Sequence, residues 1–456
     1  MTLPDTTVSG RKPTSAGGIA GVLKRPQFTL LVIGQTVSQL GDRLHNMALF
    51  ALVEAAAATE TTALEVSKVG VATLIPTAFA PIVGALVDRW NKRFTMVACD
   101  LFRAIIVAII PWIYLKFGYI WPVYVIAFFV GLAGVFFNAA KMALIPDLVE
   151  HEDLLPANAA LNTIGRVATV TGMVGGGLLV GWAVWQRIGW QGWQAGFYID
   201  SLSYAISVLT LVGIMLLSHA AFRRNGQHHE HPLAESAEVV REEIAHFRSN
   251  MRETFRLIKT HHGLRFVFLM VVVLGALAGS IFNILSSATL SVLGAGTEGL
   301  GILGGILAGG MIVGSLAVGT VGAKWDKRWM MVIGCLLMGG LMVLGSAWFS
   351  YAVFLPIAFF GGAVLAPVMV SMDTLLHEWS PRRARGLVFS TRDTVLGASF
   401  VSVNLLAGVV IAALPAIADT PYAVGLFIFG LIVVVGTLGA SWTQLRLDRA
   451  LRKERQ

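Results

Sequence analysis

Residues 84–97 read GALVDRWNKRFTMV, and residues 319–332 read GTVGAKWDKRWMMV. Aligned without a gap, the two stretches share glycine, tryptophan, lysine, arginine, methionine and valine at a constant offset, and Arg89 is matched by Lys324. Each stretch is a short polar break that follows a long apolar run. A duplication of this kind in apolar surroundings indicates two related halves, as in membrane transporters that rock two bundles around a central site.

The composition is that of a membrane protein. Of the 456 residues, 56% are hydrophobic and only 13% are charged, with a mean hydropathy of +0.73. Soluble globular chains have roughly 45 to 50% apolar and about 25% charged residues. A soluble enzyme, a nucleic-acid-binding module and a secreted disulfide scaffold are therefore excluded. The two cysteines, Cys99 and Cys335, lie inside apolar runs, where small packing roles are expected.

The apolar runs have the length of transmembrane helices. A helix needs about 20 apolar residues to cross the ~30 Å hydrocarbon layer, whereas strands of a membrane barrel would alternate over about 10 residues. Twelve runs meet the helix criterion: 28–57, 66–87, 94–115, 120–145, 158–184, 197–217, 266–293, 300–322, 329–349, 353–376, 387–414 and 422–442. We predict an all-α membrane protein with twelve transmembrane helices in two pseudo-symmetric six-helix bundles.

Charge divides the chain further and predicts its orientation. The predicted parts are an N-terminal tail (1–27), a first bundle (28–217), a linker (218–265), a second bundle (266–444) and a basic tail (445–456). Lys and Arg gather in the tails, the linker and alternate loops, whereas the remaining loops hold only Lys116 and Arg187. By the positive-inside rule, both termini are expected in the cytoplasm of a multi-pass protein of the cytoplasmic (inner) membrane. The positive charge thus reports orientation rather than a nucleic-acid partner.

The linker contains an amphipathic pattern and a histidine cluster. Six apolar residues recur at spacings of three to five and predict a helix on the cytoplasmic membrane surface: Val239, Ile244, Phe247, Met251, Phe255 and Ile258. His228, His229 and His231 precede it. These histidines fit either a solvated linker or a metal-binding segment, and the solvated linker is the simpler interpretation.

The first polar break carries a family resemblance. Its six matching positions are Gly84, Leu86, Asp88, Arg89, Lys92 and Arg93. They resemble the cytoplasmic loop signature of the major facilitator superfamily, with Asn91 where that signature usually has a second glycine. The resemblance implies twelve helices and alternating access. It also implies that the loop aspartate engages the N-terminal end of the eleventh helix when the cytoplasmic side is closed, since a helix N-terminus stabilises an anion.

Two further stretches are similar to particular branches of that superfamily. Residues 34–43, GQTVSQLGDR, and 137–149, FNAAKMALIPDLV, resemble macrolide-type and siderophore exporters. The Ala-Lys-x-x-x-x-Pro form within the second stretch is also similar to bacterial lysophospholipid transporters. Residues 172–177, GMVGGG, come close to a glycine-rich antiporter motif, but Met173 replaces its proline. Both substrate classes stay open at this level.

Ionisable residues inside the predicted spans mark candidate sites, because each costs about 2.5 to 3.5 kcal/mol on insertion scales. The candidates for coupling or substrate binding are Asp42, Arg43, His45, Asp100, Arg103 and Arg166. Asp42 lies about 20 Å from the start of its helix, near mid-membrane, and is the candidate for reversible protonation. Its expected partner is Arg103 or Arg166, since Arg43 points about 100° away. A static ion pair that only joins helices is the alternative.

The same ionisable residues raise the alternatives of a metal site and a cytoplasmic gate. Asp42 and His45 share a helix face, as a ferroportin-like metal site would require, but no further ligand completes a coordination set there, so we predict no metal.

The resemblance places spans four and five opposite spans ten and eleven at the cytoplasmic mouth. The gate candidates are Lys141, Arg166, Asp373, Arg392 and Asp393. We predict that a cation-anion pair forms between the halves when the protein opens outward.

These patterns together predict a secondary active transporter that exports amphipathic small molecules of drug, macrolide or siderophore type by alternating access, with proton coupling. A lysophospholipid transporter is the alternative, and a metal exporter or a non-transport receptor fits the sequence less well. Primary pumping and enzymatic catalysis are not expected, because no phosphate-binding loop and no catalytic constellation occur. The expected partners are the substrate, H⁺ and the lipid bilayer, with no cofactor, and the chain is expected to be a monomer.

Overall fold

A computed structural model describes residues 18–222, 245, 249, 252–320, 325–381, 384–414 and 420–454. The described residues form helices and turns only, which confirms the predicted all-helical class. The first half contains α1 (Gly18–Val22), α2 (Pro26–Ala56), α3 (Thr62–Leu74), η1 (Ile75–Phe79), α4 (Ala80–Asp88), α5 (Lys92–Phe117), α6 (Trp121–Leu148), η2 (His151–Asp153), α7 (Leu154–Gly181), α8 (Val184–Arg187) and α9 (Gly192–Phe222). The second half contains α11 (His262–Ser291), α12 (Gly296–Thr320), α13 (Lys327–Ala347), α14 (Tyr351–Trp379), α15 (Arg385–Ala413) and α16 (Pro421–Glu454).

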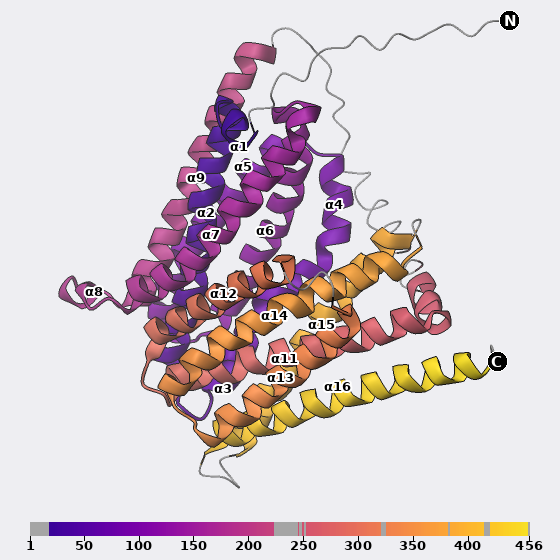
Figure 1. Ribbon diagram of the computed structural model, residues 1–456. Helices are drawn as coiled ribbons and strands as arrows, with labels where there is room; N and C mark the ends of the chain where they lie inside the picture. The colour runs from indigo at the N-terminus through magenta and orange to yellow at the C-terminus, as the bar shows by residue number, and fades with distance from the viewer. Residues whose placement is uncertain are drawn as a thin grey trace, which may run out of the picture.

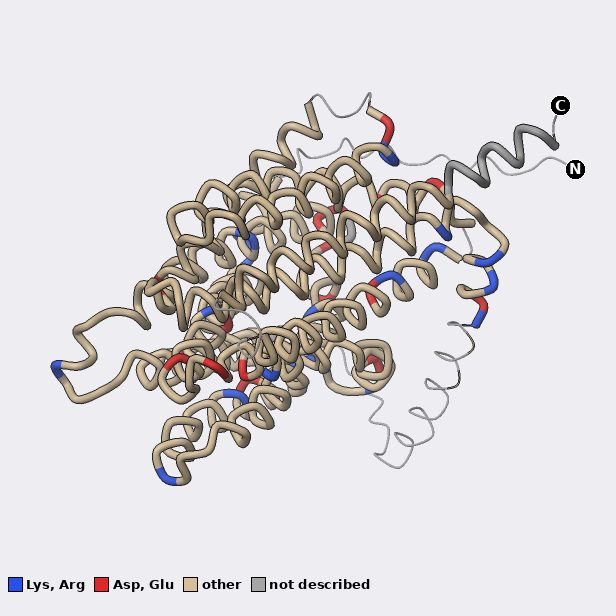
Figure 2. Tube along the Cα trace, turned by 90° about the horizontal axis from the view of Figure 1, so that it is seen from below, with Lys and Arg blue, Asp and Glu red and all other residues tan. Residues whose placement is uncertain are grey.

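Most of these helices meet the requirements for a membrane span. In the described part of the chain, 11 helical segments are long and apolar enough to cross a bilayer, and α3, η1 and α4 count as one of them. The 31-residue α2 is not in that set, since polar residues such as Gln35, Gln39 and Asp42 lower its hydropathy. It nevertheless packs along α7 and α9 as the first helix of its bundle, which completes the twelve predicted spans. Figure 2 shows long stretches without charge between the turns.

The second predicted span differs from a straight helix. The sequence predicts one run over 66–87, but the helix begins at Thr62 and changes to a 3-10 turn at Ile75–Phe79 before it continues as α4. Pro76 and Pro81 explain the change, because proline supplies no N–H and clashes with the preceding helical turn. The helix also loses its buried face here, since residues 77–81 are all exposed.

The duplicated stretches adopt equivalent local structures in the two halves. Asn91 caps α5 by accepting a hydrogen bond from the Phe94 N–H at 3.2 Å, and Asp326 caps α13 by accepting one from the Arg328 N–H at 2.9 Å. Such caps satisfy N–H groups that the first helical turn leaves without a partner. The repeat in the sequence thus corresponds to a repeat in the fold.

An ion pair follows each cap. Lys92 Nζ lies 3.4 Å from Asp147 Oδ2 and ties the start of α5 to the end of α6. Lys327 Nζ lies 2.5 Å from Glu378 Oε1 and ties the start of α13 to the end of α14 in the same way. Exposed pairs of this kind contribute roughly 0 to 1 kcal/mol each, so they align helix ends more than they stabilise the bundle.

The linker and the C-terminal tail differ in part from the predicted divisions. The α9 helix continues to Phe222, α11 begins at His262, and α16 runs on to Glu454. Residues 252–260 are helical, and Leu257 and Ile258 pack against the core of the second bundle. The rest of the predicted amphipathic helix and the histidine cluster lie outside the described residues.

The two bundles meet near one end of the molecule. Between bundles, α7 packs on α12, α3 on α11 and α15, and α2 on α12 (Figure 1). We call this the far end; it includes Thr297 at the start of α12. The opposite, motif end includes Asp88 and the duplicated caps, and Figure 1 shows the bundles diverging towards it.

Glycine allows two helices of opposite bundles to approach closely at the far end. A Cβ atom on Gly177 of α7 would lie 2.9 Å from the Gly301 Cα and from the Thr297 carbonyl oxygen of α12. No side chain fits between these backbones, and small residues of this kind are typical of tight helix contacts in membranes. The glycine-rich stretch 172–177 therefore has a packing role in this structure.

Candidate functional site

Helices α2, α5, α6 and α9 bring a charged cluster into the interior of the first bundle. Arg103 of α5 is at its centre and forms ion pairs with Asp100 on its own helix and with Asp42 on α2, where Nη1 and Oδ1 are 3.7 Å apart. Its guanidinium also lies over the rings of Phe137, at 4.9 Å, and Tyr204, at 4.4 Å. Two carboxylates and two aromatic faces thus surround a cation that is almost fully buried.

Asp42 connects this cluster to the exposed surface of the bundle. Its Oδ1 accepts a hydrogen bond from the Tyr204 hydroxyl at 2.5 Å, yet its side chain remains 39% exposed, whereas the Asp100 side chain is 0% exposed. Asp42 thus has one edge bonded to the interior of the bundle and another edge that other protein atoms leave uncovered. Of the two partners expected from the sequence, the structure places Arg103, and not the exposed Arg166 of α7, beside Asp42.

A second buried pair lies one helical turn further along. His45 Nδ1 on α2 is 3.0 Å from Asp200 Oδ2 on α9, and both side chains are buried. Gly41 permits this proximity, because a Cβ there would lie 1.9 Å from Ser203 Oγ and 2.7 Å from Asp200 Oδ1. Asp200 is not among the candidates predicted from the sequence, although it is an ionisable residue inside the predicted span 197–217 like the others.

Lys141 and Arg43 take different positions around this cluster. Lys141 of α6 is 9% exposed and close enough to Asp42 and Arg103 for their charges to act on it. Arg43 turns towards α7, since a Cβ on Gly172 would meet its Cβ at 2.9 Å. Lys141 therefore belongs to the charged cluster, whereas Arg43 has a packing contact on a different face of α2.

The gate candidates of the second bundle pair with one another. Arg392 Nη2 lies 2.5 Å from Asp373 Oδ1 of α14, and Arg392 Nη1 lies 2.8 Å from Asp393 Oδ1 on the same helix. Arg392 and Asp393 are neighbours in the sequence and interact directly. Asp373 and Asp393 are thus paired within their own bundle in this conformation. The predicted ion pair with Lys141 or Arg166 stays a prediction for the outward-open conformation.

The loop signature lies at the motif end. Gly84 and Asp88 belong to α4, Arg89 follows it, and Lys92 and Arg93 begin α5. Asp88 is exposed at the C-terminal end of α4, where the helix dipole does not favour a carboxylate. The Asp88 carboxylate therefore gains nothing from its own helix end. The partner expected from the family resemblance is the N-terminus of α15, which begins at Arg385 in the opposite bundle.

A buried polar junction joins the bundles and was not expected from the sequence. The Asn283 amide of α11 donates to Ser67 Oγ of α3 at 2.8 Å, and the Asn404 amide of α15 donates to the Ser67 carbonyl oxygen at 3.0 Å. Ser67 Oγ also lies 3.0 Å from the Asn404 carbonyl oxygen. These side chains are at most 1% exposed, so separating the bundles here means breaking hydrogen bonds in a dry interface.

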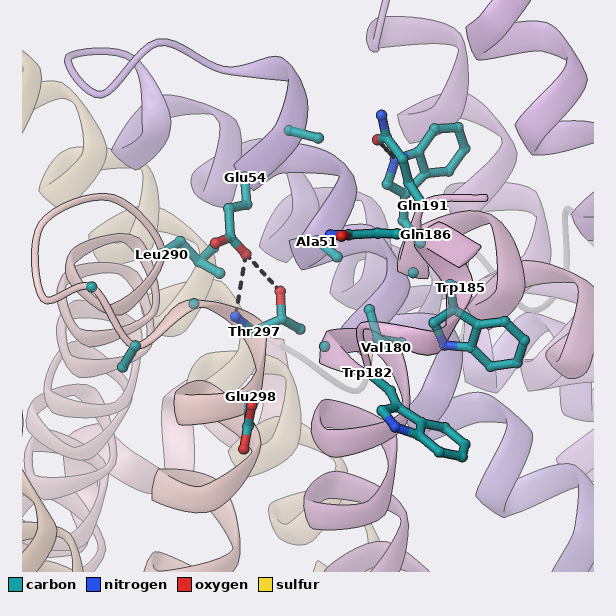
Figure 3. A pocket seen from close by; sticks show the side chains of 17 residues that line it. Ala51, Glu54, Val180, Trp182, Trp185, Gln186, Gln191, Leu290, Thr297 and Glu298 are labelled. Atoms are coloured by element: carbon teal, nitrogen blue, oxygen red, sulfur yellow. Dashed lines mark hydrogen bonds between the residues drawn. The ribbon is translucent and has the colours of Figure 1, made fainter. Parts of the chain in front are cut away.

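A cavity of about 730 Å³ opens at the far end between the bundles. Figure 3 shows Glu54 of α2 reaching across to α12, where its Oε2 accepts hydrogen bonds from the Thr297 N–H at 3.2 Å and from the Thr297 hydroxyl at 2.8 Å. Glu298, Gln186 and Gln191 line the same cavity. The Glu54 carboxylate thus caps a helix of the opposite bundle, where the helix dipole favours it.

The site also bears on the metal alternative. Within the part of the chain that the structure describes, no group of three or more His, Cys, Asp and Glu side chains is placed to hold a metal ion. His45 and Asp200 are two potential ligands, but Arg103 stands near them as a competing cation.

A model of the Major Facilitator Superfamily matches residues 31–312, more than half of the chain. The chain is 32% identical over 106 residues to the uncharacterised MFS-type transporter YvqJ of Bacillus subtilis (strain 168), a match that spans only 25% of that protein.

Solved structures share the fold over nearly the whole chain. A bacterial homologue of the human lysosomal transporter Spinster, in an inward-facing and unoccupied conformation, has a TM-score of 0.66 at 13% identity over 94% of this chain and 97% of that one. The nucleoside transporter NupG has a TM-score of 0.65 at 13% identity, over 91% and 99%. A bacterial homologue of the iron transporter ferroportin, inward-facing, has a TM-score of 0.64 at 15% identity, over 91% and 98%.

Proposed function

Because the chain belongs to the major facilitator superfamily and is an integral, multi-pass membrane transporter of that type, we propose that it is a proton-driven exporter of amphipathic small molecules. The family and the fold are those of a transporter rather than an enzyme. The proposal adds three elements to this class: a coupling ion, a direction and a kind of substrate.

The observation that carries the proposal is the charged cluster in the first bundle. Ionisable groups inside membrane helices are costly and usually mark substrate or proton pathways. Here Asp42 forms an ion pair with the buried Arg103, while part of its own side chain remains exposed. Protonation of Asp42 would weaken its ion pair with Arg103 and its bond with Tyr204, and so change how α2, α5 and α9 are held together. That link between a proton and helix packing is what coupling requires.

The proposed orientation rests on the distribution of charge. The excess of Lys and Arg in the tails, the linker and the loops of the motif end supports a cytoplasmic position for that end. In that orientation the contacts between the bundles, made by α7 with α12 and by α3 with α11 and α15, lie away from the cytoplasmic end. Both termini would then lie on the cytoplasmic side of the inner membrane, with the chain acting as a monomer in the bilayer.

Labelling tests the orientation. On a background in which Cys99 and Cys335 are alanine, a cysteine at the exposed Thr61 should react with a membrane-impermeant maleimide added to intact cells. A cysteine at the exposed Lys259 should react only after the cells are opened. The reverse pattern would overturn the proposed orientation.

The kind of substrate is supported by residues 34–43 and 137–149, which resemble exporters of macrolides and siderophores. The structure adds that Asp42 and Lys141, one from each stretch, belong to the same cluster. A lysophospholipid is the second candidate, because Ala140, Lys141 and Pro146 fit the pattern similar to lysophospholipid transporters, and a buried lysine suits a phosphate group.

Proteoliposomes containing the purified protein provide the test. Accumulation of labelled macrolides, siderophores and lysolipids is measured with and without an imposed pH gradient. Asp42→Asn should abolish gradient-driven accumulation and leave thermal stability near that of the wild type, since shape is kept and charge is lost. Glu60→Gln, at an exposed side chain in the turn between α2 and α3, is the matched control and should transport normally. Normal transport by Asp42→Asn would refute the coupling role, and a failure of that variant to fold would favour a static ion pair.

A further inference from the structure

Two cross-helix contacts follow one another between α2 and α9. Asp42 and Tyr204 make the first, and His45 and Asp200 make the second. His45 follows Asp42 by three residues and Asp200 precedes Tyr204 by four, so each pair of neighbours shares a helix face. The first contact is partly exposed and the second is buried on both sides. The two contacts thus lie in sequence along the α2–α9 interface, from the partly exposed Asp42 to the buried pair of His45 and Asp200.

The enclosed pair has few other partners. The Asp200 side chain is 0% exposed, and besides His45 its nearest donor is Ser203 Oγ, 3.4 Å from Oδ1. The edge of the Phe197 ring packs on His45 with ring centroids 5.3 Å apart. A bare carboxylate in such surroundings is strongly disfavoured, because burial removes its hydration and a neutral imidazole compensates little. A proton on the pair converts it into an imidazolium and a carboxylate, which neutralise one another.

The surrounding charges lead to the same conclusion. The charged or titratable groups near the His45–Asp200 pair are Asp42 from α2, Arg103 from α5 and Tyr204 from α9. In the wider cluster, three acidic side chains (Asp42, Asp100 and Asp200) lie near two basic ones (Arg103 and Lys141), and we count all five as charged. The cluster is therefore one positive charge short of neutrality when the His45 imidazole is unprotonated, and one added proton balances it.

We propose that His45 and Asp200 form the enclosed proton-binding site of this transporter, with Asp42 as the group through which the proton enters and leaves. The proton is released by the Asp42 carboxylic acid, which becomes a carboxylate, and is bound by the His45 imidazole, which becomes an imidazolium paired with Asp200. The inference deepens the proposed function and rests on its proton coupling. It assigns the equilibrium binding of the proton to one pair and the rate of exchange to another residue.

Proton uptake by the purified, full-length protein tests the site without any substrate. A pH-indicator dye measures the protons bound after a jump from about pH 8.5 to about pH 5.5, a range that includes histidine titration. His45→Gln and Asp200→Asn should each bind about one proton fewer than the wild type, and the double variant should lose the same single proton, because the two residues titrate as a unit. His377→Gln, at an exposed histidine of α14, is the matched control, and its effect should add to that of Asp200→Asn in a double variant. Losses that add up in the double variant would overturn the proposal.

Distance measurements connect the proton to the bundles. Spin labels at Leu155 of α7 and Ser390 of α15, both exposed, report the separation of the bundles towards the motif end. The distance distribution should change with pH in the wild type. It should lose its pH response in His45→Gln and Asp200→Asn. An unchanged wild-type distribution, or a retained response in both single variants, would overturn the proposal.

A charge-swapped variant covers the case in which the single variants do not fold. His45→Asp combined with Asp200→His keeps the pair and its volume, so it should restore both folding and the pH response. A swapped protein that folds but does not respond to pH would overturn the site. If the pair binds its proton and moves the bundles while no pH gradient drives accumulation of any panel compound, then the proposed proton-driven export fails and the proton site stands.

Discussion

Substitution of Glu54 by glutamine should weaken the closure of the far end. The carboxylate of Glu54 accepts two hydrogen bonds from Thr297, at 3.2 and 2.8 Å, and meets the N-terminus of α12 across the bundle interface. Glutamine keeps an acceptor oxygen but loses the charge. Hydrogen bonds to a charged group contribute about 1.5 to 3 kcal/mol when sheltered, and an anion at a helix N-terminus contributes about 0.3 to 1 kcal/mol. Because Glu54 is exposed to the cavity, we expect a loss of about 1 kcal/mol.

A change of about 1 kcal/mol corresponds to a roughly fivefold change in the ratio of two conformers. The ratio of far-end-open to far-end-closed molecules should therefore rise about fivefold in Glu54→Gln. Pulsed electron resonance between spin labels at Thr61 and Val292, which are exposed at the far ends of the two bundles, measures that ratio. Glu298→Gln is the matched control, since Glu298 lines the same cavity and begins the same helix. Equal shifts in the two variants, or none in Glu54→Gln, would refute the assignment of the closure to the Glu54 contact.

Two other substitutions test the bundle interface. Asn404→Ala removes hydrogen bonds to the buried Ser67, at a cost of about 1 to 3 kcal/mol, so the midpoint of thermal unfolding in detergent should fall; an unchanged midpoint would contradict a dry junction. Gly301→Val places a branched side chain where even a Cβ would be 2.6 Å from the Met173 carbonyl oxygen, so the yield of folded protein should drop or the far end should separate by the electron-resonance assay. Gly309→Val, where a Cβ meets nothing within 4 Å, should behave like the wild type, and equal effects of the two valines would argue against a backbone contact.

The architecture could be predicted from the sequence because the bilayer imposes simple requirements. Helix length and continuous hydrophobicity follow from the thickness of the membrane, and the duplicated stretches at 84–97 and 319–332 relate the two halves. The interruption at Ile75–Phe79 was also signalled, since Pro76 stands inside the predicted run. Helix boundaries moved by a few residues because caps and turns, rather than hydrophobicity, decide where a helix ends.

The site could be predicted only in part, for two reasons. Charge inside a span is visible in the sequence, so Asp42 and Arg103 were selected, and Asp200 met the same criterion without being selected. Which helices lie side by side is not visible, and that decides whether Arg103 or Arg166 stands next to Asp42. Neutral polar residues such as Asn283 occur widely in membrane helices, so a junction of three of them emerges only once three helices are packed together.

The position of the Gly177–Gly301 contact near one end of α7 means that a small rotation there produces a large displacement at the other end. Along α7, the distance from Gly177 to Leu154 at the motif end is about 35 Å at 1.5 Å per residue. A rotation of about 15° around the glycine contact would therefore carry the motif end through about 9 Å, whereas atoms one helical turn from the contact would move by only about 1.4 Å. The helix acts as a lever with its fulcrum close to one end. A displacement wide enough to admit a small molecule on one side of the membrane then requires little more than a sliding of backbone against backbone on the other.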